Sequence, residues 1–171
     1  MLPRRPFQRN RYLTGRLLSA EDFQREQDYV VNKGRLHNRY LHGWGVVDGL
    51  RVSADGNSVV VTPGLAIDCQ GNDVLLPEPV RLTWSRKAGR CFVTIRYAET
   101  PTGATPSPGG STEPAIIRED ALVEICSSNP LHRHARPGMP GCGTPHAIAL
   151  ATLGLRQGRR SVAALRVRLP R

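Results

Sequence analysis

The stretch that decides the fold runs from Tyr12 to Leu76 and reads YLTGRLLSAEDFQREQDYVVNKGRLHNRYLHGWGVVDGLRVSADGNSVVVTPGLAIDCQGNDVLL. Its first part predicts one long helix that begins after Ser19, because a serine hydroxyl can accept from the free amides of the first turn. A stripe that recurs every three or four positions from Phe23 to Leu41 is mostly apolar, although Gln27 and His37 interrupt it, and such a stripe is typical of a helix with one apolar face. That face favours packing against the chain's own sheet over use in subunit contacts, and Gly34 within it suggests a close neighbour.

The pattern changes after the helix to short β-branched runs separated by turn signals. The sequences Asp55-Gly56-Asn57 and Gln70-Gly71-Asn72 supply the positive φ that tight hairpins require. Strand-like runs continue at 80–84, 91–97, 121–126, 146–153 and 162–169, the last as an edge strand. The residues expected to act as structural hinges and turn positions are Gly43, Trp44, Gly45, Gly49, Gly64 and Gly71.

These patterns predict an α+β fold that is mainly β, with one long N-terminal helix packed on an antiparallel β-sandwich or small barrel. The organisation has four parts: a basic N-terminal arm (1–18), a core of helix plus β-meander (19–98), a Pro/Gly/Ser-rich surface loop (99–114) and further strands (115–171). The last part contains an irregular loop at 127–145 and ends in a basic segment.

The positive charge is concentrated at the two ends of the chain. The formal net charge is +10, and only Lys33 and Lys87 are lysines. Guanidinium groups bond carboxylates in a fixed fork, so the ends suit attachment to acidic protein neighbours. Nucleic-acid binding is an alternative, but no recognition helix is recognisable and aromatic residues make up only 5% of the chain. The proposed partner-binding residues are Arg4, Arg5, Arg9, Arg11, Arg16, Arg159, Arg160, Arg166 and Arg168.

One loose group of thiols and imidazoles could bind a metal. Its members are Cys126, His132, His134, Cys142 and His146, and zinc accepts such ligands. The spacing has no Cys-x-x-Cys pair, however, and Arg133 separates two of the histidines. These features favour Cys126 as a small buried hydrophobic residue and the histidines as exposed loop residues. We therefore expect no cofactor, with zinc as the alternative.

Catalytic arrangements are also poorly supported. Cys142 and His146 could form a thiol–imidazole pair, but no third orienting group is identifiable from spacing. The chain shows neither a convincing carboxylate pair nor a phosphate-binding glycine loop. We expect a non-enzymatic protein, with a small zinc-binding or thiol enzyme as the alternative.

Targeting features are not recognisable. The first fifteen residues lack the apolar core of a secretory signal, and no apolar run of about 20 residues could span a bilayer. We expect synthesis in the cytoplasm without a signal peptide.

The first half of the chain resembles a recurrent domain of bacterial contractile injection systems and related phage-tail appendage proteins. The next strand, CFVTIRYAETP, is also similar to that family, although the loop after it lacks the additional cysteines. The resemblance implies a structural subunit of a phage-tail-like particle, at the baseplate or at its peripheral fibre, cage or spike attachment. It also implies partners among the other subunits, including copies of itself. The matching positions are Tyr12, Gly15, Leu18, Asp22, Phe23, Gln27, Tyr29, Leu36, His37, Asn38, His42, Gly43, Gly45, Val46, Gly49, Leu50, Pro63, Gly64, Ala66, Asp68 and Gly71.

Overall fold

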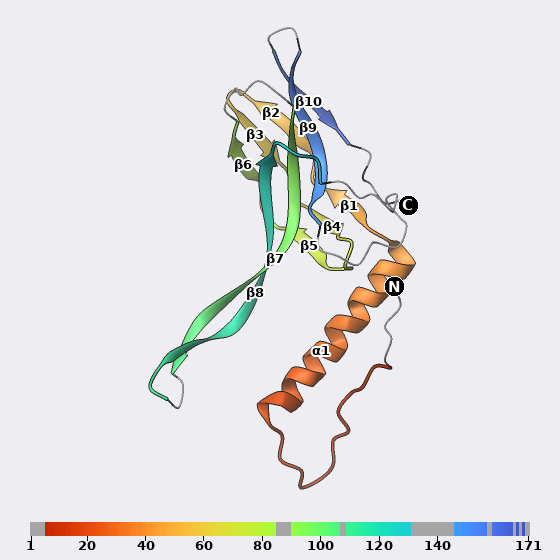
Figure 1. Ribbon diagram of the computed structural model, residues 1–171, viewed down its shortest axis with the longest axis vertical. Helices are drawn as coiled ribbons and strands as arrows, with labels where there is room; N and C mark the ends of the chain where they lie inside the picture. The colour runs from red at the N-terminus through yellow and green to blue at the C-terminus, as the bar shows by residue number, and fades with distance from the viewer. Residues whose placement is uncertain are drawn as a thin grey trace.

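The computed structural model describes residues 6–84, 90–106, 109–130, 146–156, 159–165, 167 and 169. Figure 1 shows a β-sheet body from which one helix and one long hairpin project. The elements are helix α1 (Ala20–His37), a π-helical turn (Asn38–His42), and strands β1 (Gly45–Gly49), β2 (Val52–Asp55), β3 (Ser58–Val61), β4 (Gly64–Ile67), β5 (Asp73–Leu76), β6 (Val80–Thr83), β7 (Cys91–Pro106), β8 (Thr112–Cys126), β9 (Ile148–Arg156) and β10 (Arg159–Ala164).

Helix α1 begins at the predicted residue. Ser19 is its N-cap, and the Ser19 backbone N–H donates to Asp22 Oδ2 at 3.3 Å. The last turn widens into the π-helical turn, where the Gly43 N–H donates to the Asn38 carbonyl at 2.9 Å. Gly43 then takes a φ of +77°, which ends the helix.

The expectation that the helix packs on its own sheet is wrong. Asp22 is its only buried residue, while Phe23 and Val30 are 58% and 61% exposed. In Figure 1 the helix extends away from the body and meets it only at its C-terminal end. Gln27 and His37 interrupt the apolar face, so it offers too little continuous apolar area to cover a sheet. The expected close neighbour of Gly34 is also wrong, because a Cβ there would meet nothing within 4 Å.

The body contains three antiparallel sheets, with strand orders β1-β4-β5, β2-β3-β6 and β10-β9-β7-β8. All three contribute to one core, in which Val59, Val74, Val93 and Ile148 are at most 1% exposed. The predicted α+β, mainly β class is confirmed. The barrel alternative is wrong, because the sheets do not close into a barrel over the described residues.

The surface loop predicted at 99–114 is wrong where the structure describes it. Strands β7 and β8 pair antiparallel from Phe92↔Cys126 out to Pro106↔Thr112. Strand β9 pairs with β7 only from Cys91 to Ile95, so the outer part of the hairpin is two-stranded. We call residues 99–106 and 112–119 the ribbon. Prolines are tolerated there because each strand of a two-stranded ribbon has an open edge that needs no ladder bond.

The C-terminal residues lie along the body. β10 is an edge strand of its sheet, as predicted, but the predicted bounds 162–169 are wrong, because the strand runs Arg159–Ala164. Beyond it, the Val46 N–H donates to the Val167 carbonyl at 2.6 Å, and the Leu169 N–H donates to the Val46 carbonyl at 2.9 Å. The described part of this basic segment is therefore attached to β1 of its own chain.

Candidate interaction surface

The end of α1 is joined to the body by polar contacts with the β4–β5 turn. Arg35 Nε donates to Asn72 Oδ1 at 2.5 Å, and Asn38 Nδ2 donates to the Gly71 carbonyl and to Asp73 Oδ1, both at 3.0 Å. A Cβ on Gly71 would lie 2.2 Å from the Arg35 carbonyl oxygen. Helix and turn therefore approach so closely that only glycine fits at position 71.

The turn that receives the helix is held by its own hydrogen bonds. The buried Asp68 carboxylate accepts from the backbone N–H groups of Gln70 and Asn72 at 2.8 and 2.9 Å. Asn72 Nδ2 donates to the other Asp68 oxygen at 2.8 Å, which leaves Asn72 Oδ1 directed to Arg35. This local network fixes the acceptor for the helix end, as expected of an Asx-type turn.

Residues 6–18, which we call the strap, run back along α1. The Phe7 ring meets Tyr29 edge to face at 6.3 Å between centroids, and Lys33 Nζ lies 5.7 Å from the Phe7 centroid. Near the helix start, Arg25 donates to Asn10 Oδ1 at 2.9 Å. Early strap residues thus contact late helix residues, so strap and helix are antiparallel.

Asp22 anchors the other end of the strap. Arg16 and Arg25 both reach Asp22 Oδ1, at 2.7 and 2.8 Å. The backbone N–H of Ser19 is the main cause that holds the pKa of Asp22 below its usual range, with further help from the two guanidinium groups. The carboxylate therefore stays ionised where strap and helix meet.

A groove of about 920 Å³ lies between α1 and the ribbon. Its exposed apolar side chains include Val30, Val31, Ile116 and Ile117, which are 40–61% exposed. Charge in the groove is mainly negative, because four carboxylates accompany one guanidinium group. The charged lining residues are Glu26, Asp28, Glu99, Glu119 and Arg35.

Two of these carboxylates face each other across the ribbon. Glu99 and Glu119 are direct partners in the β7–β8 register, an arrangement that destabilises a sheet when no cation intervenes. Arg35 lies 3.2 Å from Glu99, and the Tyr97 hydroxyl donates to Glu99 at 2.8 Å. Burial, followed by its bonds to both carboxylates, raises the pKa of Tyr97, so its hydroxyl remains a donor. Glu119 makes no ion pair within the described part of the chain.

The predicted partner-binding arginines have different surroundings. Arg9 and Arg11 are exposed on the strap and make no ion pair with any described residue, whereas Arg16 pairs with Asp22. The backbones of Arg159 and Arg160 pair with those of Arg156 and Leu155 in the β9–β10 hairpin. Arg4, Arg5, Arg166 and Arg168 lie outside the described residues. Partner binding by these arginines stays a prediction.

The predicted hinge residues lie where backbones come close. Gly49 pairs with Gly64 between β1 and β4, and a Cβ on Gly49 would lie 2.0 Å from the Pro63 carbonyl oxygen. Trp44 is 3% exposed and belongs to the core. Gly43, Trp44 and Gly45 connect the π-helical turn to β1, so they set where the helix leaves the body.

The predicted metal ligands are only partly described. Cys126 lies at the end of β8, with its Sγ 3.6 Å from Thr94 Oγ1, and His146 precedes β9. His132, His134 and Cys142 lie outside the described residues. Among the residues that are described, no three potential ligands come together. The cluster is therefore untested.

Sequence reasoning missed both the groove and a histidine pair. His37 Nε2 lies 3.1 Å from His42 Nε2, because the π-helical turn places residues five apart on one side. A regular helical period gives no sign of that pairing. The acidic groove was missed because half of it belongs to a segment that resembled a loop.

Comparison with solved structures shows where this fold occurs. The structure entitled "The baseplate complex from the type VI secretion system" contains a chain that matches 91% of this one with a TM-score of 0.51 and 12% identity. This chain spans 40% of the length of that chain. At such low identity the match shows a shared fold. No family model and no curated protein matches the sequence.

Within the described ranges, no helix combines the length and the apolar character needed to cross a membrane.

Proposed function

We propose that the protein is a non-enzymatic structural subunit of a phage-tail-like contractile injection particle, at the baseplate or its peripheral fibre, cage or spike attachment. The observation that carries the proposal is the pair of projecting elements, α1 with its strap and the ribbon. Both extend beyond the core that folds the chain (Figure 1). Elements that bury so little of their side-chain surface within their own chain are suited to pack against neighbouring subunits.

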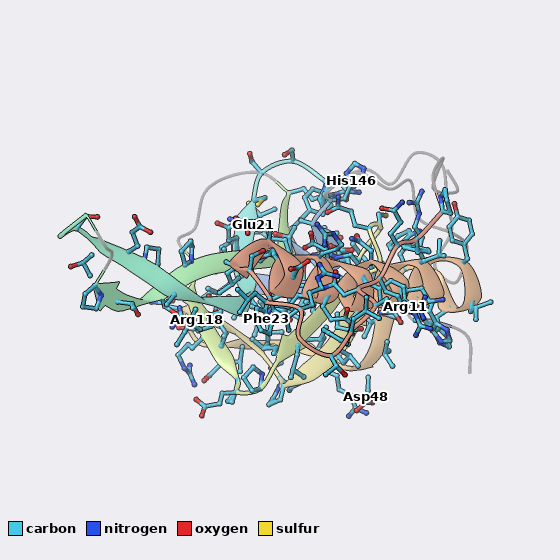
Figure 2. All side chains as sticks on the ribbon, turned by 90° about the horizontal axis from the view of Figure 1, so that it is seen from below. Arg11, Glu21, Phe23, Asp48, Arg118 and His146 are labelled. Carbon is cyan, nitrogen blue, oxygen red and sulfur yellow. The ribbon has the colours of Figure 1, made fainter. Side chains whose placement is uncertain are left out.

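Exposed apolar side chains on these elements support the proposal. Leu17 on the strap is 93% exposed, and Phe23 and Val30 on α1 are 58% and 61% exposed. In Figure 2, which looks at the molecule from below, Phe23 and Glu21 mark the free end of the helix and Arg118 marks the ribbon. Together with the baseplate fold, this distribution favours an assembly role over a catalytic one. The described residues that line the groove also include no cysteine, serine, histidine or lysine nucleophile.

The test is to locate the chain in particles from the native cell. A tagged chain should co-purify with sheath and inner-tube proteins, and electron microscopy of labelled particles should place it at a fixed position on one end. Residence in such a particle, held in the cytoplasm or released, is part of the proposal. Dispersed label, with none on tail-like particles, would overturn it.

A further inference from the structure

We propose that the acidic groove between α1 and the ribbon binds the strap-bearing face of α1 from a second copy of this chain. The contact deepens the proposed function by naming one partner, and it rests on that function for its biological setting. Charge is the first reason. The strap exposes Arg9 and Arg11 without carboxylate partners in the described part of their own chain. The groove presents Asp28 and Glu119, which form no ion pair with any described cationic side chain.

Helix geometry separates these groups within one chain. The strap is held by Asp22, Arg25, Tyr29 and Lys33, which recur every three or four residues on one side of α1. The groove is centred on a different helix face. At 3.6 residues per turn, that face lies about opposite the strap. Its central residues are Gln24, Gln27, Asp28, Val31 and Arg35. Each chain thus carries both halves of a complementary contact, on opposite sides of one helix.

Apolar surface is matched as well. The strap exposes Tyr12 and Leu13 at 57% and 56%, and Phe7 is 38% exposed. The groove exposes Ile116 and Ile117 on the ribbon at 59% and 61%. Docking would cover both sets and would place guanidinium groups beside Glu119, relieving its repulsion with Glu99.

The contact joins two different surfaces, so it repeats. Each bound copy still presents its own groove or its own strap face to a further copy. A heterologous contact of this kind closes into a ring when the rotation permits. It otherwise forms an open chain. Either arrangement places several copies side by side, as a particle with repeated subunits requires.

The first test is sedimentation equilibrium of the full chain over micromolar concentrations at moderate ionic strength. We expect concentration-dependent association beyond the monomer. The double variant Asp28→Asn/Glu119→Gln should bind about ten-fold more weakly, equivalent to about 1.4 kcal/mol. A chain that stays monomeric at every concentration would overturn the proposal.

Charge exchange separates this contact from unspecific effects. Asp28→Arg/Glu119→Arg should abolish association, and so should Arg9→Glu/Arg11→Glu. Mixing the two variants should restore a hetero-complex, because the arginine groove then meets a carboxylate strap. The matched control is Asp48→Arg/Glu78→Arg, which makes the same charge change at exposed carboxylates outside the groove. Figure 2 marks Asp48 at an edge of the molecule.

The control should associate like the original chain. Equal loss in the control and the groove variant, or no hetero-complex from the mixture, would contradict docking in the groove. The association experiment and the location of the chain on particles test different proposals. A chain that does not self-associate but is found on particles would reject only the second-copy contact and would leave the proposed function intact.

Discussion

Gly71 lies where the end of the helix comes close to the body. It has a φ of +90°, and a Cβ there would lie 2.2 Å from the Arg35 carbonyl oxygen. Gly71→Ala should lower the free energy of unfolding by on the order of 3 kcal/mol, because positive φ and the backbone clash both oppose it. Urea denaturation measures the change.

A glycine with open surroundings gives the control. Gly56 has a φ of +55° and nothing within 4 Å of an added Cβ. Gly56→Ala should cost about 1 kcal/mol, since it introduces only the backbone strain. Equal costs at the two sites would show that the approach of Arg35 to Gly71 is not tight in solution.

Gly34 should respond in the opposite direction. It lies inside α1 with a regular helical backbone, and an added Cβ meets nothing within 4 Å. Gly34→Ala should stabilise the helix by about 0.5–1 kcal/mol. The gain should be measurable as a higher free energy of unfolding or as a higher helical content by circular dichroism. A loss of stability would indicate that a neighbour packs closely on this position after all.

Asp22 should make the strap sensitive to acid. Its pKa is lowered in the folded chain by the Ser19 N–H and the two arginines. A depressed carboxyl pKa contributes stability that is present above its unfolded value of about 3.9 and is lost as pH falls through the folded pKa. Hydrogen exchange should therefore show the strap progressively released from α1 as the pH falls below about 3.9, with release complete only below the folded pKa of Asp22.

Asp22→Asn tests the cause of that release. The variant should show faster strap exchange at neutral pH and a smaller change on acidification. Asp28→Asn lies on the groove side of the same helix and should leave the strap unaffected. A strap that remains bound in Asp22→Asn would mean that Phe7 and Asn10 suffice to hold it.

At the scale of elements, the backbone amide hydrogens of the ribbon should exchange with solvent faster than those of the sheet that the ribbon extends. Within the described part of the chain, residues 102–106 and 112–116 pair only with each other, and isolated two-stranded hairpins are marginal in water. Amides at 92–95 lie between β8 and β9 and should be protected far longer. Self-association should increase the protection of the ribbon amides from hydrogen exchange. Equal protection of the ribbon and the sheet in the monomer would contradict this expectation.

The elements also differ in how well the sequence predicts them. Turn chemistry located the hairpins well, since Asp55-Gly56-Asn57 and Gln70-Gly71-Asn72 both connect paired strands. Periodicity located α1 but not its neighbour, because the contact between Arg35 and Asn72 spans 37 residues. The ribbon was missed because Pro101, Gly103 and Pro114 resemble a loop, and only pairing with another proline-containing strand makes them β. Long-range pairing of this kind leaves little local signal.

At the scale of the whole molecule, the core and the contact surfaces are separate. The core residues extend from Trp44 to Leu153, whereas the hydrogen bonds, ion pairs and ring contacts that join the strap to other described elements are all with α1. Deleting residues 1–11 removes Phe7, Arg9, Asn10 and Arg11 but keeps the Arg16–Asp22 ion pair. The truncated chain should keep its β-sheet spectrum and cooperative unfolding, with a melting temperature lowered by a few degrees at most. It should nevertheless fail to join the particle, which quantitative mass spectrometry of purified particles would measure.

A point variant distinguishes loss of the strap from exposure of the helix beneath it. Phe7→Ala retains Arg9 and Arg11 while removing the ring that covers Tyr29. If the arginines make the attachment, Phe7→Ala should be incorporated far better than the truncated chain, and Arg9→Gln/Arg11→Gln should be incorporated as poorly as the truncation. Normal incorporation of the chain without residues 1–11 would show that α1 and the ribbon bind the particle without the N-terminal arginines.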